Sequence, residues 1–154
     1  SSLPWDLVFL LGAAMAVSGV LTGEGTGVKE FVSGLITPLF AGRSEFVFLA
    51  LLCAITLILT NIANNAVVAF MMLTVTYIFS TQFAINQPLA ISFINLTCII
   101  AFLLPASSMF GAMLYANTEW IETKRIPGVA VVIVLIVFIV LLALGIPLGS
   151  LLYR

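Results

Sequence analysis

The sequence contains no histidine, and Asp6 is its only aspartate. It therefore has no serine–histidine pair, no pair of membrane aspartates and no His-Glu-x-x-His zinc motif, which excludes the usual active sites of an intramembrane protease. Only 7% of the residues are charged, the net charge is −1, and no block of basic residues is present to attract nucleic acid. We expect no enzyme, no nucleic-acid partner and no resident cofactor.

Cysteine is also scarce. Cys53 and Cys98 lie singly inside apolar runs, so we predict that both are small buried hydrophobic residues rather than metal ligands or redox groups. Every charge lies at the end of an apolar segment or in a loop, which gives no support for proton coupling through a carboxylate within the membrane. The chain starts at Ser1 and shows no signal peptide. We expect a processed product or part of a longer polypeptide.

Long apolar runs, in contrast, are abundant: hydrophobic residues make up 63% of the chain. The runs are continuous, whereas the strands of a membrane barrel would alternate apolar and polar residues. We therefore predict an all-α integral membrane protein with a single transmembrane domain over residues 1–154. Its expected parts are a transmembrane helix at 3–21, a re-entrant hairpin at 46–80, a broken helix at 88–118 and a transmembrane helix at 128–153.

A polar cluster interrupts the second run. It reads Thr60-Asn61-Ile62-Ala63-Asn64-Asn65-Ala66. As helices, the apolar arms at residues 46–60 and 66–80 would each be about 22 Å long, which is short of a hydrocarbon core of about 30 Å. A re-entrant hairpin with its tip at 60–66 fits these lengths better than the alternative, two short spans joined by an external turn. Asn61 is expected to cap the turn.

A second interruption follows the apolar residues 89–104. The sequence continues Pro105-Ala106-Ser107-Ser108-Met109-Phe110-Gly111 before apolar character resumes. Proline removes a helical hydrogen bond and glycine loosens the backbone, so this pattern predicts a discontinuous helix broken between Pro105 and Gly111. A simple proline kink in one long helix is the alternative.

Together, the hairpin tip and the broken helix predict a binding site without charged side chains. Backbone that is not helical is tolerated within a membrane only when it is buried in protein or lines an aqueous cavity. Helix N-termini attract anions, and unwound carbonyls and hydroxyls bind Na⁺. Such a combination suits a small anion that travels together with cations.

At these residues the chain resembles the C-terminal half of the divalent anion/sodium symporter family, which belongs to the ion transporter superfamily with inverted repeats. That family has a hairpin ending in Ser-Asn-Thr and a later helix break reading roughly Leu-Pro-Val-Ala-Thr-Pro-Pro-Asn-Ala. The opening Pro4-Trp5-Asp6 is similar to the segment before the family's hairpin. The resemblance covers most of the chain, and its motifs follow in the right order.

The resemblance implies roles for particular residues. The substrate would contact Asn64, Asn65, Ala66 and Ser108. One Na⁺ would take oxygens from Thr60, Ala63, Asn65 and Ser107. The chain departs from the family at both motifs: Asn64-Asn65-Ala66 stands in place of Ser-Asn-Thr, and Ser107-Ser108-Met109-Phe110-Gly111 in place of Ala-Thr-Pro-Pro-Asn. The missing hydroxyl at Ala66 puts dicarboxylate specificity in doubt.

The expected function is Na⁺-coupled secondary transport of small anions, such as di- or tricarboxylates. Because inverted-repeat transporters build one site from two halves, we expect a missing N-terminal half or a partner chain. The resemblance also implies a homodimer in the plasma or inner membrane, as a multi-pass protein. Three alternatives stay open: a non-transporting membrane subunit, a related permease with another substrate or coupling ion, and a channel-like pore, which no charged ring supports.

Overall fold

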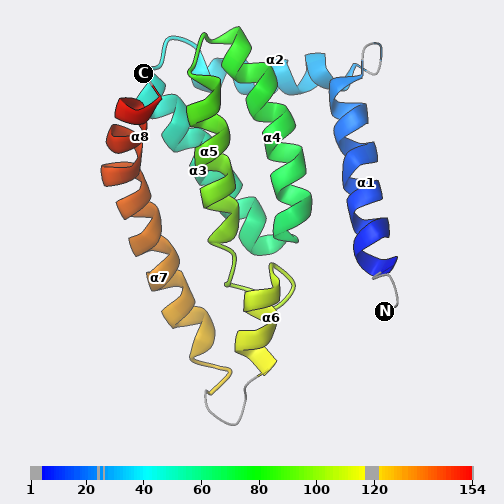
Figure 1. Ribbon diagram of the computed structural model, residues 1–154, viewed down its shortest axis with the longest axis vertical. Helices are drawn as coiled ribbons and strands as arrows, with labels where there is room; N and C mark the ends of the chain where they lie inside the picture. Colours follow the sequence, from blue (N-terminus) through cyan, green and yellow to red (C-terminus); the bar gives the residue numbers. More distant parts are fainter. Residues whose placement is uncertain (1–4, 24, 26, 117–121, 154) are drawn as a thin grey trace.

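The computed structural model describes residues 5–23, 25, 27–116 and 122–153, and this part of the chain is helical, without strands (Figure 1). The all-helical prediction is confirmed for these residues. In chain order the helices are α1 (Trp5–Thr22), α2 (Val28–Phe40), α3 (Glu45–Ile62), α4 (Asn65–Gln82), α5 (Gln87–Ile99), α6 (Met109–Ala116), α7 (Ile126–Val140), the π-helical turn η1 (Leu141–Gly145) and α8 (Ile146–Leu152).

Three helices in the described part of the chain are long and apolar enough to cross a membrane. They are α3, α4 and the continuous helix formed by α7, η1 and α8, which runs over Ile126–Leu152 with 27 residues. The last of these covers most of the transmembrane helix predicted at 128–153. Helix α1 covers most of the segment predicted at 3–21, of which residues 3 and 4 lie outside the described residues.

Helices α3 and α4 form an antiparallel hairpin, and α5 packs against both of them (Figure 1). Helix α1 lies along the other side of α4, and α2 runs across the end of the hairpin opposite its tip. The helix α7–η1–α8 lies beyond α5 and extends past the hairpin tip. The core between these helices is apolar and contains both cysteines, Cys53 and Cys98, which are buried as predicted.

Aromatic side chains hold the base of the hairpin, the end where α3 begins and α4 ends. Phe40 from α2 lies 4.8 Å, between ring centroids, from Phe48 of α3 and 6.3 Å from Phe79 of α4. Phe83 completes this cluster, 6.2 Å from Phe79. These offset ring contacts add to the dispersion energy of a closely packed apolar core.

The tip of the hairpin is tighter than the sequence predicted. Only Ala63 and Asn64 are non-helical, because Thr60, Asn61 and Ile62 continue α3 and Asn65 begins α4. Each arm therefore has 18 residues, or about 27 Å, rather than the expected 22 Å. The arm-length estimate was wrong, and length alone no longer separates a re-entrant hairpin from two full spans.

The helix break also lies earlier than predicted. Helix α5 ends at Ile99, residues 100–108 are non-helical, and Phe110 and Gly111 already belong to α6. Pro105 is therefore inside the unwound segment and does not start it. The predicted broken helix at 88–118 corresponds to α5, this segment and α6, and its residues 117 and 118 lie outside the described residues.

Close packing against α5 and a proline shape the last helix. Pro147 cannot donate a helical hydrogen bond, and the π-turn Leu141–Gly145 accommodates that loss just before it. A Cβ atom at Gly149 would lie 2.6 Å from the Leu89 side chain, and one at Gly145 would lie 3.0 Å from Phe93. The Gly145–Gly149 spacing thus serves packing within the chain.

Candidate functional site

Two side chains at the end of α3 reach across to the end of α5. The Thr60 hydroxyl donates a hydrogen bond of 3.1 Å to the carbonyl of Cys98. The Asn61 amide nitrogen donates to the carbonyl of Ile100 at 2.7 Å, and the Asn61 oxygen accepts from the backbone N–H groups of Phe102 at 3.2 Å and Leu103 at 3.1 Å. The hairpin tip and the helix break are therefore joined directly.

These contacts use the full hydrogen-bonding capacity of Asn61. Its amide nitrogen makes a second bond, of 2.9 Å, to the carbonyl of Leu57 in its own helix. An asparagine side chain offers two donors and one oxygen with two lone pairs, and all four positions are occupied. The residue is only 4% exposed. Asn61 is thus a structural clamp with nothing left to offer a ligand.

The clamp also explains why α5 stops at Ile99. In a continued helix, the N–H groups of Phe102 and Leu103 would bond to the carbonyls of Cys98 and Ile99. Instead Asn61 accepts from both N–H groups, and Thr60 occupies the Cys98 carbonyl. The helix break is therefore caused by side chains from another helix, and Pro105 prevents the helix from resuming at once.

Two serines organise the rest of the break. The Ser107 hydroxyl donates to the Leu104 carbonyl at 2.6 Å, and Ser108 donates to the Ala101 carbonyl while accepting from the Gly111 N–H at 3.0 Å. Ser108 thereby acts as the N-cap of α6. A Cβ atom at Gly111 would lie 2.6 Å from the Leu104 carbonyl oxygen, so only glycine fits this close approach.

The first residues of α4 and α6 meet at the hairpin tip. The Asn65 N–H donates to the carbonyl of Ser107 at 2.8 Å, so the N-termini of the two helices lie close together. From this level α4 runs toward the base of the hairpin and α6 runs away from it (Figure 1). Helices α3 and α5 end at the same level. The tip therefore combines two positive and two negative helix ends.

The structure gives different positions to the four predicted substrate residues. Asn64 caps α4, since its side-chain oxygen accepts from the Ala66 N–H at 3.0 Å. The Ser108 hydroxyl is buried and used within the break. Asn65 is half-buried, and its side-chain amide makes no hydrogen bond within the described residues. Asn65 is the asparagine of this set whose whole side-chain amide is without a partner among the described residues, whereas Asn64 uses its oxygen for the cap.

The four predicted Na⁺ ligands are close in the fold but unequal in exposure. Thr60 and Ser107 are fully buried, whereas Ala63 is exposed and Asn65 is half-buried. The Ser107 carbonyl already accepts from Asn65, and the Thr60 hydroxyl retains its lone pairs after donating to Cys98. No cluster of three His, Cys, Asp or Glu side chains occurs among the residues that the structure describes. A cation at the tip would depend on neutral oxygens.

The end of α3 faces the last helix across an apolar cavity of about 260 Å³. Its lining includes Asn61 and Ile62 from α3, Leu103 from the break, and residues of α7 between 131 and 135. None of the four predicted substrate residues lines this cavity. The hairpin tip therefore lies alongside about the first third of the helix over Ile126–Leu152.

Asn61 is the important residue that the sequence analysis misassigned, because we expected it to cap the hairpin turn. The sequence contained one signal against that role: Asn64, directly before α4, is in the N-cap position and performs the capping. The side chain of Asn61, three residues earlier, is therefore not needed as a cap and can bond elsewhere. Its partners, the backbone of residues 100–103, lie about forty positions later, and no local pattern identifies them.

Comparisons of the chain with protein-family models, with curated proteins and with solved structures gave no match.

Proposed function

We propose that this chain forms one half of a secondary transporter for small anions, coupled to Na⁺, with its site at the hairpin tip. The observation that supports this most strongly is the hydrogen bond between Asn65 and Ser107, which brings the N-termini of α4 and α6 together. Two helix N-termini at one point provide N–H groups and a local positive potential that favour a bound anion. The unpartnered Asn65 amide lies at the same point.

The long helix supports a position for the tip within the membrane. Its 27 residues extend over about 40 Å, so a centred hydrocarbon core of about 30 Å would begin about 5 Å from its start. The tip faces residues 131–135, which lie about 7 to 14 Å from that start. On this basis α3 and α4 form a re-entrant hairpin, and the unwound segment after α5 lies at the same depth.

The coupling ion would bind on the opposite side of the same point. Helices α3 and α5 both end there with their carbonyl ends, which favour a cation. Thr60, Ala63, Asn65 and Ser107 are the proposed oxygen donors. The substrate would lie against Asn64, Asn65, Ala66 and the start of α6 at Ser108. Because Ala66 lacks a hydroxyl, the site favours an anion with fewer contacts than a dicarboxylate.

The proposed site is incomplete within this chain. Asn65 is only half-buried and Ala63 is exposed, so the part of the chain that the structure describes leaves one side of the tip uncovered. The resemblance to the symporter family suggests that an inverted repeat supplies the cover, either as an N-terminal half or as a partner chain, within a homodimer of the plasma or inner membrane. The isolated chain is therefore expected not to transport. Anion uptake into proteoliposomes that contain this chain alone would contradict that expectation.

A second function is favoured by a specific observation. Asn61, Ser107 and Ser108 all use their side chains for hydrogen bonds within the chain. A non-transporting membrane subunit, in which polar residues only hold helices together, would show the same pattern. The two functions make different predictions for the hairpin tip: a transporter binds ions there, whereas a non-transporting subunit does not.

Cysteine accessibility separates these functions. In the intact membrane protein, Ala63→Cys places a thiol at the exposed tip, while native Cys53 and Cys98 are buried and should not react with a membrane-impermeant thiol reagent. A transporter site predicts that labelling occurs and slows when small anions and Na⁺ are added together. Thr81→Cys, at the exposed far end of α4, is the control and should be insensitive to ions. Labelling of Ala63→Cys that no ion affects would favour the non-transporting subunit.

A further inference from the structure

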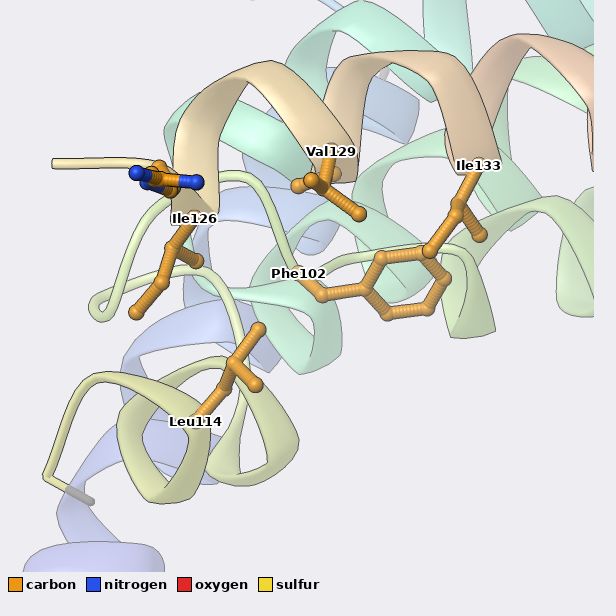
Figure 2. A pocket seen from close by; sticks show the side chains of 7 residues that line it. Phe102, Leu114, Ile126, Val129 and Ile133 are labelled. Carbon is orange, nitrogen blue, oxygen red and sulfur yellow. The ribbon is translucent and has the colours of Figure 1, made fainter. Parts of the chain in front are cut away.

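A second apolar cavity, of about 170 Å³, lies between α7, α6 and the unwound segment (Figure 2). Phe102 enters it from the unwound segment and Leu114 from α6, while the first turns of α7 form the remaining wall. Its lining consists of Phe102, Leu114, Arg125, Ile126, Val129, Ala130 and Ile133. Apart from the guanidinium of Arg125, every lining side chain is apolar.

The size and lining of this cavity fit part of a hydrocarbon chain. An apolar protein cavity of about 150 Å³ holds a benzene-sized group, so this cavity accommodates a stretch of about six carbons. It provides no polar side chain that would orient water or a polar ligand in its interior. Because it lies at the start of a helix that is long enough to span a membrane, acyl chains are the apolar groups available to fill it.

Arg125 provides a charge at one end of the cavity. Its side chain is 78% exposed, and its Nε donates to Glu122 at 2.7 Å. An arginine has five N–H donors, so four stay without a partner among the described residues. The neighbouring Lys124 adds a second positive charge. Residues in this position, immediately before a spanning helix, lie at the level of the lipid headgroups.

We propose that this cavity is a binding site for an anionic phospholipid, with one acyl chain between α6 and α7 and the phosphate on Arg125. Glu122 holds the guanidinium through Nε and leaves its outer nitrogens for a bidentate phosphate contact. The bound chain would fill the space between Phe102 and Ile133 and thus support the unwound segment through its contact with Phe102. This site is independent of the proposed transport function.

Photo-crosslinking tests the site. The intact chain is reconstituted in phosphatidylcholine vesicles. One preparation contains a trace of phosphatidylglycerol with a diazirine on its acyl chain, and the other contains a trace of phosphatidylcholine with the same diazirine. We expect the anionic lipid to label peptides around Phe102, Leu114 and Ile133 more strongly than the zwitterionic lipid does. Arg125→Gln should reduce the anionic labelling about fivefold. Excess inorganic phosphate should not compete, because it has no acyl chain.

Two further variants separate charge from cavity. Lys124→Gln removes the same charge beside the cavity without changing its lining, and it should retain most of the labelling. Val129→Trp keeps Arg125 but fills the cavity from a position that is 58% exposed, and it should abolish the labelling of these peptides. The proposal is overturned if the two lipids label equally, if Arg125→Gln labels like the wild type, if Val129→Trp has no effect, or if phosphate alone competes.

Discussion

The two ends of the α3–α4 hairpin are held by different forces. At the base, the rings of Phe40, Phe48 and Phe79 pack together without polar contacts between their side chains. At the tip, Thr60 and Asn61 make hydrogen bonds to the backbone of residues 98–103. The base also has exposed hydrogen bonds, from the Asn86 N–H to Glu45 and from Gln82 to Thr37, but its buried contacts are apolar. The buried contacts of the tip, in contrast, are hydrogen bonds.

This difference supports the proposal of a site at the tip rather than at the base of the hairpin. Inside a bilayer, apolar side chains can exchange protein contacts for lipid contacts, so packing alone gives little selectivity. An unwound backbone has no such substitute, since lipid cannot hydrogen-bond to it. An uninterrupted α5 would have satisfied its own backbone. The arrangement at the tip is therefore best explained by a role for the unwound segment.

The largest expected effect is that of Asn61→Ala. The substitution leaves the Ile100 carbonyl and the Phe102 and Leu103 N–H groups without their partner, at roughly 1–3 kcal/mol each, so we expect a loss of about 4 kcal/mol. Denaturation with SDS from mixed micelles measures it. Asn95→Ala is the matched control, because Asn95 is exposed on α5 and its side chain makes no hydrogen bond among the described residues. Equal stability of the two variants would mean that the clamp does not hold the break.

Gly111→Ala tests the close packing of the break itself. The new Cβ would lie 2.6 Å from the backbone oxygen of Leu104, which also accepts from Ser107 and cannot move freely. We expect a loss of about 3 kcal/mol, at the upper end for overpacking. Gly128→Ala is the control in α7, where a Cβ meets no atom within 4 Å, and it should be neutral or slightly stabilising. The same denaturation experiment compares them.

Phe79→Ala tests the base. It removes a buried ring from the aromatic cluster, and we expect a loss of about 2 kcal/mol. This is less than in a soluble core, because the unfolded helices stay in lipid and the transfer from water is absent. Thiol labelling of Ala63→Cys at the tip should keep its ion dependence in this background. A loss of that ion dependence would show that a change at the base of the hairpin alters the tip.

Thr60→Val should lower stability less than Asn61→Ala, Gly111→Ala or Phe79→Ala. It leaves the Cys98 carbonyl alone without its partner, so we expect a loss of about 1 kcal/mol, the lower end of the cost of one such group. If Thr60 also provides an oxygen to Na⁺, the Na⁺ dependence of anion binding should weaken far more than the stability does. Titration of anion binding with Na⁺, alongside denaturation, measures both. Unchanged Na⁺ dependence would remove Thr60 from the proposed cation site.

Composition and continuous apolar runs were sufficient to predict the helical membrane character of the chain. The polar cluster at residues 60–66, which stands out in the sequence, forms the contact with the break. The details depended on tertiary contacts. Helix α5 ends at Ile99 because Asn61 bonds to the backbone beyond it, and that effect comes from another helix. The nearest local signal, Pro105, lies six residues too late.

The candidate site shows the same limit. The resemblance grouped Asn64, Asn65 and Ala66 as substrate contacts, but a local rule distinguishes among them: the first amide caps α4 through the Ala66 N–H, which leaves Asn65 free. The hydrogen-bond partners of Ser107 and Ser108 could not be predicted from the sequence. Both hydroxyls donate to carbonyls of the unwound segment, and the Asn61 clamp sets the path of that segment.

Anion binding by Asn65→Ala, measured with and without Na⁺ in the intact membrane protein, tests the proposed site most directly. The Asn65 side chain makes no hydrogen bond among the described residues, so its removal should change stability by less than about 0.5 kcal/mol. The account predicts a stable protein in which Na⁺-dependent anion binding is lost. Unchanged binding with unchanged Na⁺ dependence would contradict it.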